Sequence, residues 1–328
     1  ALSGSSPATC AAIGKMGIPE MRKRGYPDDI ATGSIAAGGT LGILIPPSVT
    51  MIVYGIATET SIGRLFLAGL LPGFMLTALF MIWTLIACRM KGLGLRDLTQ
   101  NFTLKQKFEA LPRVLPFLAI IAGVLFVLYG GVATPSEAAG AGAMFCLLLA
   151  VIIYRMWRAG PIVAMFRSSV RESVMIMMII GTAELFAYTL SSTFVTQTIA
   201  QWISDLEVNR WVLLAAVNVF LLVAGMFLPP VAIILMTAPI LLPIITSAGF
   251  DPYWFAVILT INMEIGLITP PVGLNLYVIN GIAPDVPLSS ILRGSLPYVV
   301  CMVLAIVILC IFPEIATWLP DLLMGPEL

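Results

Sequence analysis

Histidine is absent from this chain of 328 residues. Its absence excludes metal sites ligated by histidine, Ser-His-Asp catalysis and proton relays built on imidazole. Cysteine is scarce: five residues lie scattered through apolar stretches without CxxC spacing, which indicates buried thiols and no redox pair. The sequence also lacks HExxH, GxSxG and paired-aspartate motifs, so we expect no enzymatic activity and no cofactor.

Charged residues are rare as well. They make up 10% of the chain, whereas 59% of the residues are hydrophobic and the mean hydropathy is +1.03. A soluble domain is roughly 45–50% apolar, so this composition cannot supply a soluble surface. The sequence therefore predicts an all-α polytopic membrane protein with the lipid bilayer as its solvent. Lys and Arg balance Asp and Glu at 17 each, and we expect no nucleic-acid partner.

One pattern of apolar run, glycine, Pro-Pro pair and second apolar run occurs twice. The two copies, at 41–48 and 265–272, read LGILIPPS and IGLITPPV and are 224 positions apart. After one gap the match continues into LLPGF and SLPYV. Paired spans interrupted by Gly and Pro, at corresponding places in two halves of a chain, are the best sequence indication of a secondary transporter's binding site.

Eight apolar segments are long enough to cross a bilayer, which takes about 20 helical residues. They are 28–57, 65–88, 114–132, 136–154, 173–192, 211–245, 254–282 and 291–312. Pro-Pro pairs interrupt the first, sixth and seventh segments. Three polar, partly amphipathic stretches are predicted to be interfacial helices, at 92–112, 158–171 and 194–209.

The repeat predicts four parts of the chain. They are the end of the first repeat at 1–91, a cytoplasmic amphipathic connector at 92–112, the second repeat at 113–312 and a C-terminal tail at 313–328. The chain opens with ALSGSSPATC, without Met or a signal-peptide pattern, and the counterpart of the second repeat would begin well before Ala1. We therefore expect a fragment that lacks roughly three N-terminal spans, in preference to a separately folded short form.

The basic residues predict the orientation of the spans. They cluster at 22–24, 89–113 and 155–171. Two crossings separate each cluster from the next, so all three face the cytoplasm, and only Arg64 and Arg210 fall outside. Residues 211–245 then enter and leave from the outer face as a re-entrant hairpin, whereas residues 3–17 belong to a hairpin from the inner face. The repeats are therefore expected to be inverted, as alternating access requires.

Each Pro-Pro pair predicts a break in a membrane helix, because proline lacks an N–H and clashes with the preceding turn. Unwound carbonyls are oxygen ligands suited to Na⁺, and half-helix N-termini present positive dipole ends to an anion. A simple proline kink is the alternative for one such motif. Two motifs at matched positions, each paired with a hairpin, favour a binding site.

Side-chain oxygens also lie near the breaks, on Thr40, Thr269 and Asn275. Asn275 either faces a substrate or bonds across helices. The Ser-rich tip that runs from Ser3 to Ser6 is predicted to supply ligands, with a helix cap before Pro7 as the alternative.

Three acids lie in apolar segments, where acids are costly and therefore indicate function. Glu264 precedes the second break and is expected to pair with a cation or to hold the amides of the break. Glu137 follows Thr134 in the order of a capping signal. Glu184 has no assigned partner.

Taken together, these motifs resemble the large membrane subunit of tripartite ATP-independent periplasmic (TRAP) transporters along essentially the whole chain. The motifs are SGSSPAT, GGTLGILIPPS, TPSEAAG, FLPPVAIILMTAPILLP and GLITPPVGLNLYVING. The resemblance implies an ion-transporter-superfamily fold, with an inverted repeat, two re-entrant hairpins and two broken helices. It also implies an elevator-like transport domain in the bacterial inner membrane.

The resemblance implies Na⁺-coupled uptake of an organic acid. A soluble periplasmic binding protein delivers this acid, and a small membrane subunit of four spans accompanies the large one. One Na⁺ site is expected at Ser3, Ser5, Ser6, Gly39, Thr40 and Gly42. The other is expected at Gly225, Gly266, Thr269, Pro270, Val272 and Gly273. The residues expected to contact the substrate are Ser5, Ser6, Pro46, Pro230, Pro271 and Asn275.

Two departures from the family pattern concern the N-terminal spans, which this chain lacks, and the second hairpin tip. The tip reads FLPP where many members carry an acid after FL. This tip and the APDVPL segment resemble the C4-dicarboxylate subgroup more than the sialic acid subgroup. H⁺ coupling through Glu184 or Glu264, and a passive channel, are the competing hypotheses.

Overall fold

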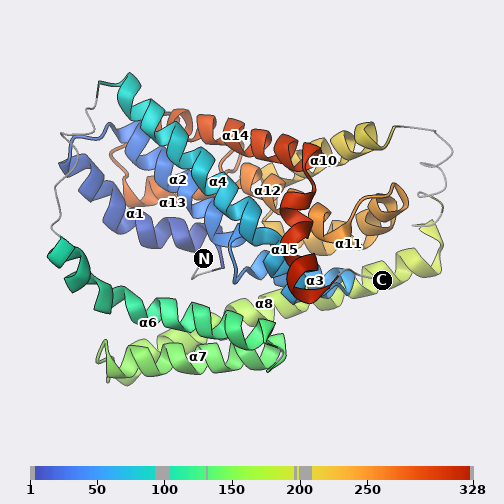
Figure 1. The fold of residues 1–328 in the computed structure, drawn as a ribbon, viewed down its shortest axis with the longest axis horizontal. Coiled ribbons are helices and arrows are strands. Elements are labelled where there is room, and N and C mark those ends of the chain that lie inside the picture. Colours follow the sequence, from blue (N-terminus) through green and yellow to red (C-terminus); the bar gives the residue numbers. More distant parts are fainter. Residues whose placement is uncertain (1–3, 93–103, 131, 196–197, 199–208, 326–328) are drawn as a thin grey trace. The chain divides into compact units, whose positions relative to one another are not determined.

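The computed structural model describes residues 4–92, 104–130, 132–195, 198 and 209–325. Over these residues the regular structure is helical throughout, which confirms the all-α prediction (Figure 1). The helices of the first part are α1 Ser6–Lys23, α2 Asp28–Leu44, α3 Val49–Thr58 and α4 Ile62–Met90. Then follow α6 Leu104–Tyr129, α7 Pro135–Ile152 and α8 Ala159–Ser192. The last part contains α10 Arg210–Phe227, α11 Pro230–Ser247, α12 Pro252–Leu267, α13 Leu274–Ile282, α14 Leu288–Ile311 and α15 Glu314–Met324.

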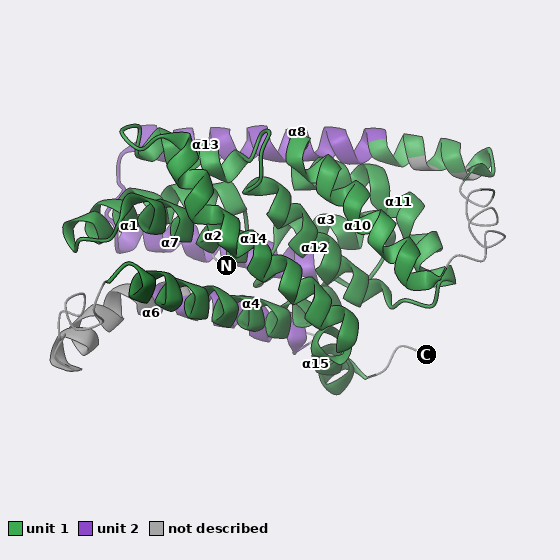
Figure 2. Ribbon diagram, turned by 90° about the horizontal axis from the view of Figure 1, so that it is seen from above, with its two compact units in different colours: residues 1, 3–98, 183–328 green, residues 2, 99–182 purple. Residues whose placement is uncertain are grey.

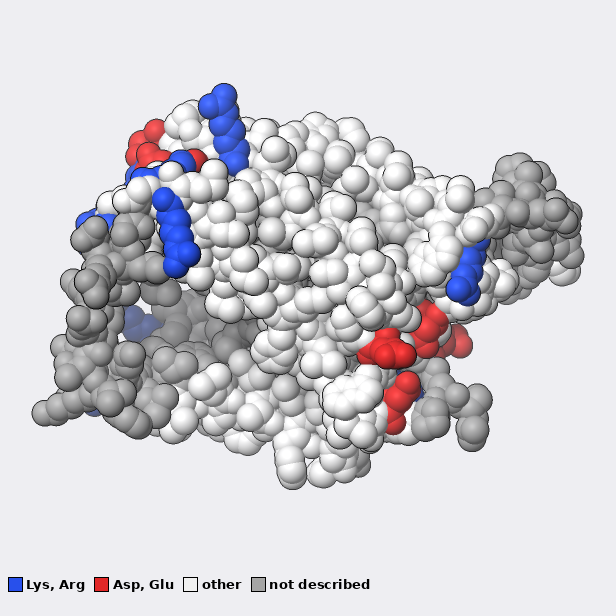
Figure 3. Space-filling view, turned by 45° about the horizontal axis from the view of Figure 1, so that its top comes forward, with Lys and Arg blue, Asp and Glu red and all other residues white. Residues whose placement is uncertain are grey.

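The described residues include seven helical segments that are long and apolar enough to cross a membrane. The segment from Asp28 to Thr58 counts as one of them although it is broken inside. On the face in Figure 3, the described charged side chains gather towards the edges and leave a broad uncharged area between them. Length, composition and this surface confirm a polytopic membrane protein.

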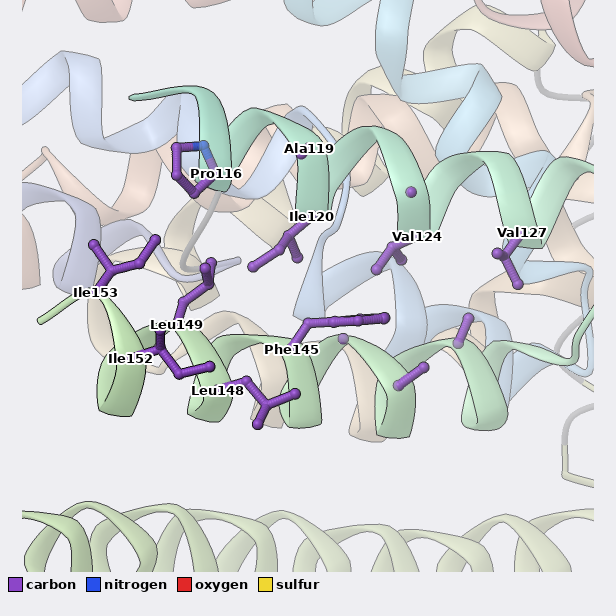
Figure 4. Close-up of a pocket in the computed structure, with 14 residues that line it drawn as sticks. Pro116, Ala119, Ile120, Val124, Val127, Phe145, Leu148, Leu149, Ile152 and Ile153 are labelled. Atoms are coloured by element: carbon purple, nitrogen blue, oxygen red, sulfur yellow. The ribbon is translucent and has the colours of Figure 1, made fainter. Parts of the chain in front are cut away.

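Residues 3–98 and 183–328 form one compact unit, and residues 99–182 form a second one (Figure 2). In the second unit, α6 and α7 pack on each other and leave a groove of about 500 Å³ between them (Figure 4). Its lining, from Pro116 to Ile153, consists of apolar side chains and glycines. A carboxylate would find no side-chain donor there, so this groove is no candidate for an anionic substrate.

The predicted elements differ from the structure in three places. The interfacial stretch 158–171 and the span 173–192 form one continuous helix, α8. Between Pro161 and Ser192 no proline interrupts the chain, so nothing ends the helix at the polar segment. The connector 92–112 already enters α6 at Leu104. The C-terminal tail contains helix α15, and most of 194–209 lies outside the described residues.

Both helix breaks lie where the Pro-Pro pairs predict them. Helix α2 ends at Leu44 and α3 begins at Val49, while α12 ends at Leu267 and α13 begins at Leu274. Pro46 has no N–H for the carbonyl four residues before it, and Pro270 lacks one in the same way. The helical hairpin also occurs as expected, with α10 and α11 meeting at Leu228 and Pro229; its re-entrant path stays a prediction.

The helix boundaries repeat with the same offset as the sequence motifs. Helices α1 and α11 begin at residues 6 and 230, and α2 and α12 at residues 28 and 252, so both pairs are 224 positions apart. The starts of α3 and α13, at 49 and 274, are 225 apart, and those of α4 and α14, at 62 and 288, are 226 apart. Four consecutive helices and their connections therefore occur twice in the first unit.

Helix α12 lies at the centre of this unit. Every residue from Tyr253 to Leu267 is buried, and α12 packs against α2, α4, α10, α11 and α14. The indole N–H of Trp254 donates to the carbonyl of Leu309 in α14 at 2.8 Å. Because α12 carries Asn262 and Glu264 among its apolar residues, protein and not lipid must surround it, since lipid offers polar side chains no partner.

Helices α2 and α14 approach each other through glycines. A Cβ added to Gly33 would overlap the backbone of Gly294, and one added to Gly294 would overlap the carbonyl of Asp29. The helices therefore touch backbone to backbone, as small residues allow in membrane bundles.

We predict that Gly33→Ala destabilises the protein, because α2 and α14 must separate to admit the methyl group. Overpacking of this kind costs about 1–3 kcal/mol. Gly38→Ala is the matched control in the same helix, because a Cβ there meets nothing within 4 Å. Thermal unfolding of the complete membrane complex in detergent should show a lower midpoint for Gly33→Ala only. Equal midpoints for the two variants would contradict this close packing.

Candidate functional site

The first break is closed by the residues that precede α1. The amide of Val49, which starts α3, donates to the carbonyl of Gly4 at 3.3 Å. Gly4 has a φ of +57°, and a Cβ there would lie 3.1 Å from the carbonyl oxygen of Pro47. Glycine is therefore required at this tip both by its backbone conformation and by the closeness of the break.

Glycines on α2 let α1 approach the same break. A Cβ on Gly39 would overlap the thiol of Cys10, and one on Gly42 would overlap the hydroxyl of Thr9. Cys10 is buried, and its thiol donates to the carbonyl of Ala36 at 3.4 Å. These contacts place the start of α1 directly on the last two turns of α2.

The second break is closed by the hairpin in a comparable way. The amide of Val272 donates to the carbonyl of Met226 at 3.3 Å, one residue before α10 ends. Gly225 and Gly266 meet closely, since a Cβ on Gly266 would overlap the Gly225 backbone. Each break therefore gives one backbone N–H to a carbonyl at the tip that covers it.

One buried side chain connects the two halves. The amide nitrogen of Asn275 in α13 donates to the hydroxyl of Ser6 at 2.8 Å and to the carbonyl of Ala36 at 3.3 Å. Asn275 and Ser6 are both fully buried. Of its two predicted roles, Asn275 thus takes the bond across helices in this structure.

The structure brings the expected site residues into two groups. Ser5, Ser6, Gly39, Thr40 and Gly42 lie at the first break, and Ser3 lies outside the described residues. Gly225, Gly266, Thr269, Pro270, Val272 and Gly273 lie at the second break. The expected substrate contacts differ in exposure: Pro46 is buried, Pro230 is half-buried and Pro271 is exposed.

The hydroxyls near the breaks bond to carbonyls of the helices that lead into the breaks. The Thr40 hydroxyl donates to the carbonyl of Ala37 at 2.6 Å, and the Thr269 hydroxyl donates to the carbonyl of Ile265. Because a hydroxyl oxygen keeps two lone pairs when its hydrogen is used, both side chains retain the capacity to bind a cation.

The three acids have different surroundings. Glu137 forms the capping box with Thr134 that the sequence predicts: the Thr134 amide donates to its carboxylate at 2.8 Å. Glu184 lies exposed on α8. Glu264 is buried in α12, with 1% of its surface exposed.

A basic side chain ties the turn between α1 and α2 to the loop before α14. The Arg22 guanidinium pairs with Asp28 at 2.7 Å and with Asp285 at 2.8 Å. Arg22 holds the pKa of Asp285 below its usual range, mainly through the hydrogen bond to the carboxylate. Asp28 starts α2 and Asp285 lies in the loop between α13 and α14, so this cluster stabilises connections and not the breaks.

Sequence reasoning missed several residues of this region. Thr9 and Cys10 contact the glycines of α2, and no local pattern marks them. Asn262 donates to the Asn218 side chain at 2.7 Å, which links α12 to α10. Two asparagines inside apolar helices were the available signal for this pair, because polar groups in a membrane interior need a partner.

Within the described part of the chain, no group of three or more Cys, Asp or Glu residues is placed to hold a metal ion. The oxygens at the breaks are backbone carbonyls, hydroxyls and amides, a donor set for hard monovalent cations.

Comparison with known proteins decides the family. The family model described as "Tripartite ATP-independent periplasmic transporter, DctM component" matches residues 1–315. The chain belongs to this family. It is therefore a TRAP transporter large permease, a multi-pass protein of the bacterial inner membrane and not an enzyme.

Similar curated proteins carry related names. The C4-dicarboxylate TRAP transporter large permease of Pseudomonas aeruginosa is 40% identical over 98% of this chain and 74% of its own length. The C4-dicarboxylate permease of Rhodobacter capsulatus is 34% identical over 98% of this chain and 76% of its own length. The sialic acid TRAP transporter large permease of Vibrio cholerae is 31% identical over 99% of this chain and 75% of its own length.

We predict opposite outcomes for the two glycines at the second break of this TRAP permease. Gly266→Ala places a methyl group into the Gly225 backbone and should push α10 off α12. Gly225→Ala is the matched control, because its Cβ would lie 3.6 Å from the Gly266 Cα, an ordinary contact. The unfolding midpoint of the complete complex should fall for Gly266→Ala, by the equivalent of about 1–3 kcal/mol, and stay near wild type for Gly225→Ala. The reverse order would refute this packing.

Proposed function

We propose that this permease imports a small carboxylate of the C4-dicarboxylate kind, coupled to Na⁺. The observation that carries the proposal is the pair of helix breaks, each covered by a tip of the chain. Pro46 and Pro47 have no N–H to bond the carbonyls of Gly42 and Ile43, four residues before each. In a membrane such carbonyls need a protein donor, water or a cation, and Na⁺ accepts several of them at once.

The same breaks suit an anion on their other side. Helices α3 and α13 begin directly after the Pro-Pro pairs, and their first amides carry the positive end of the helix dipole. The Ser48 hydroxyl accepts from the amide of Met51 at 3.2 Å, which satisfies part of the α3 terminus. The amides at the two helix starts other than those of Val49 and Met51 stabilise a carboxylate, while Na⁺ at the breaks offsets its charge, so no buried arginine is required.

We assign the movement to an elevator mechanism, in which the part that carries the breaks and hairpins shifts across the membrane against a fixed scaffold. Support comes from the duplicated helices, since two inverted copies give one arrangement open to each side. The glycine contacts between α1 and α2, and between α10 and α12, favour movement of each tip together with its break.

The TRAP family implies a small membrane subunit and a periplasmic binding protein as partners. We propose that the small subunit has four spans and that the binding protein delivers the substrate. Relatives named for C4-dicarboxylates support the substrate class. Others are named for sialic acid, isethionate and ectoine, so membership of the family alone does not fix the substrate.

H⁺ coupling is the second candidate, and one observation favours it. Glu264 is a fully buried carboxyl whose oxygens accept no hydrogen bond from any residue that the structure describes. The exposed position of Glu184 gives it no comparable support.

Uptake into proteoliposomes that contain the complete membrane complex tests the proposal. Labelled C4-dicarboxylate is offered with its binding protein under an inward Na⁺ gradient, and then under a K⁺ gradient with a pH step. Uptake that saturates and requires both Na⁺ and the binding protein supports the symporter. Equal uptake with K⁺ and the pH step would replace Na⁺ by H⁺, and uptake that does not saturate would indicate a channel.

Two hydroxyl deletions test the sites. Thr40→Val and Thr269→Val remove one oxygen from each break and preserve side-chain shape. Because a lost ligand costs about 1 kcal/mol or more, the Na⁺ concentration for half-maximal uptake should rise at least about fivefold. Thr246→Val is the control, since this exposed hydroxyl at the end of α11 bonds only within its own helix. Unchanged Na⁺ dependence in both break variants would place the ions elsewhere.

A further inference from the structure

Glu264 is a buried acid to which the proposed sites at the two breaks give no role. It is in α12, two residues before Gly266, and 1% of its surface is exposed. Neither carboxyl oxygen has a hydrogen-bond partner, and none of the ion pairs among the described residues includes it. A carboxylate without a partner is among the most costly groups to bury in a protein interior.

A chain of polar contacts leads away from this carboxyl. The Ser6 hydroxyl of α1 lies next to it, and the Cys10 thiol follows one turn later on the same helix. Ser6 in turn accepts the bond from Asn275 of α13, and the thiol donates to the Ala36 carbonyl of α2. Through Ser6 and Cys10, α1 thus connects the surroundings of Glu264 with α13 and α2.

Acceptors outnumber donors in this cluster. Both oxygens of Glu264 and the Oδ1 of Asn275 are buried without a hydrogen-bond partner among the described residues. The Asn275 nitrogen already donates twice and the thiol of Cys10 donates to a carbonyl, so the Ser6 hydroxyl is the one donor left among these four side chains. A single hydroxyl satisfies one of three oxygens. A surplus of buried oxygens around one negative charge is the composition of a cation site.

We propose that Glu264, Ser6 and Asn275 bind a monovalent cation in addition to the ions at the two breaks, and that Ser6 belongs to this site and not to the ligands of the first break. The inference deepens the proposed Na⁺ coupling and rests on it for the choice of Na⁺ as the ion. The Glu264 carboxylate neutralises the cation, while Asn275 Oδ1 and the Ser6 oxygen complete the ligand set. This ion therefore balances a charge of the protein, whereas ions at the breaks balance the substrate.

The repeat shows why the site is single. With the offset of 224 positions, the counterpart of Glu264 is Thr40. Thr40 carries no charge, so the first half has no equivalent of this site. The ligands also come from both copies, because Ser6 belongs to α1 and Asn275 to α13, the helix that follows the second break. A cation bound at this site stabilises the contact between the two copies of the repeat.

The test compares the complete membrane complex in NaCl and in choline chloride of equal concentration. Its first measurement is the thermal unfolding midpoint of the wild type and of Glu264→Gln, which keeps the shape and removes the charge. In choline, the variant should unfold at a higher temperature than the wild type, because it buries no unpaired carboxylate. Na⁺ should raise its midpoint by less than it raises that of the wild type.

Glu184→Gln is the matched control, because it removes an exposed acid from another apolar helix and should leave the Na⁺ shift unchanged. Glu264→Asp keeps the charge and withdraws it by one methylene, so it should need a several-fold higher Na⁺ concentration for the same shift. Equilibrium binding of labelled Na⁺ adds a count: Glu264→Gln should bind one ion fewer per complex than the wild type. This count does not depend on transport.

Several results would overturn the inference. An equal Na⁺ shift in wild type and Glu264→Gln, with an equal ion count, would exclude a cation at Glu264 and leave the break sites intact. If lowering the pH in choline raises the unfolding midpoint of the wild type as much as Na⁺ raises it, Glu264 binds a proton and not a cation. Absence of any Na⁺ shift or bound Na⁺ in the wild type would instead refute the proposed Na⁺ coupling as a whole.

Discussion

The Pro-Pro pairs of this chain remove backbone hydrogen bonds of membrane helices, and lipid cannot replace these bonds. In water, a carbonyl that loses its helical N–H finds a new donor at once, but lipid offers none. The structure meets this constraint by bringing another part of the chain onto each break, with Gly4 over the first and Met226 over the second. Close approach in turn requires glycine at the contact, as at Gly39 and Gly266. The tips and the glycines together therefore satisfy the backbone groups that the breaks leave open.

A break covered by a tip occurs twice in the chain, but the two copies are not identical. Pro46 is buried, whereas its counterpart Pro270 at the second break is exposed. Glu264 lies where the first copy has Thr40. The repeat gives the protein two breaks and two tips. Differences between the copies allow them to take distinct roles in ion binding, substrate binding and movement.

Local features were predictable from the sequence, and distant contacts were not. A Pro-Pro pair or the capping order of Thr134 and Glu137 acts within a few residues, so its effect is visible in the sequence alone. The bond between Asn275 and Ser6 joins residues 269 positions apart, and only packing decides it. The continuity of α8 was missed for a related reason: polarity suggested a boundary, but the backbone has no residue there that stops a helix.

The most direct test of the account is a cryo-electron microscopy structure of the complete complex in Na⁺, compared with one in choline. The account predicts both tips on their breaks in Na⁺, with ion density beside the carbonyls of Gly42 and Gly266. In choline that density should be absent and the contacts of the tips loosened. Tips that lie away from the breaks in Na⁺, or breaks whose carbonyls face lipid, would contradict the claim that each break is built to be covered.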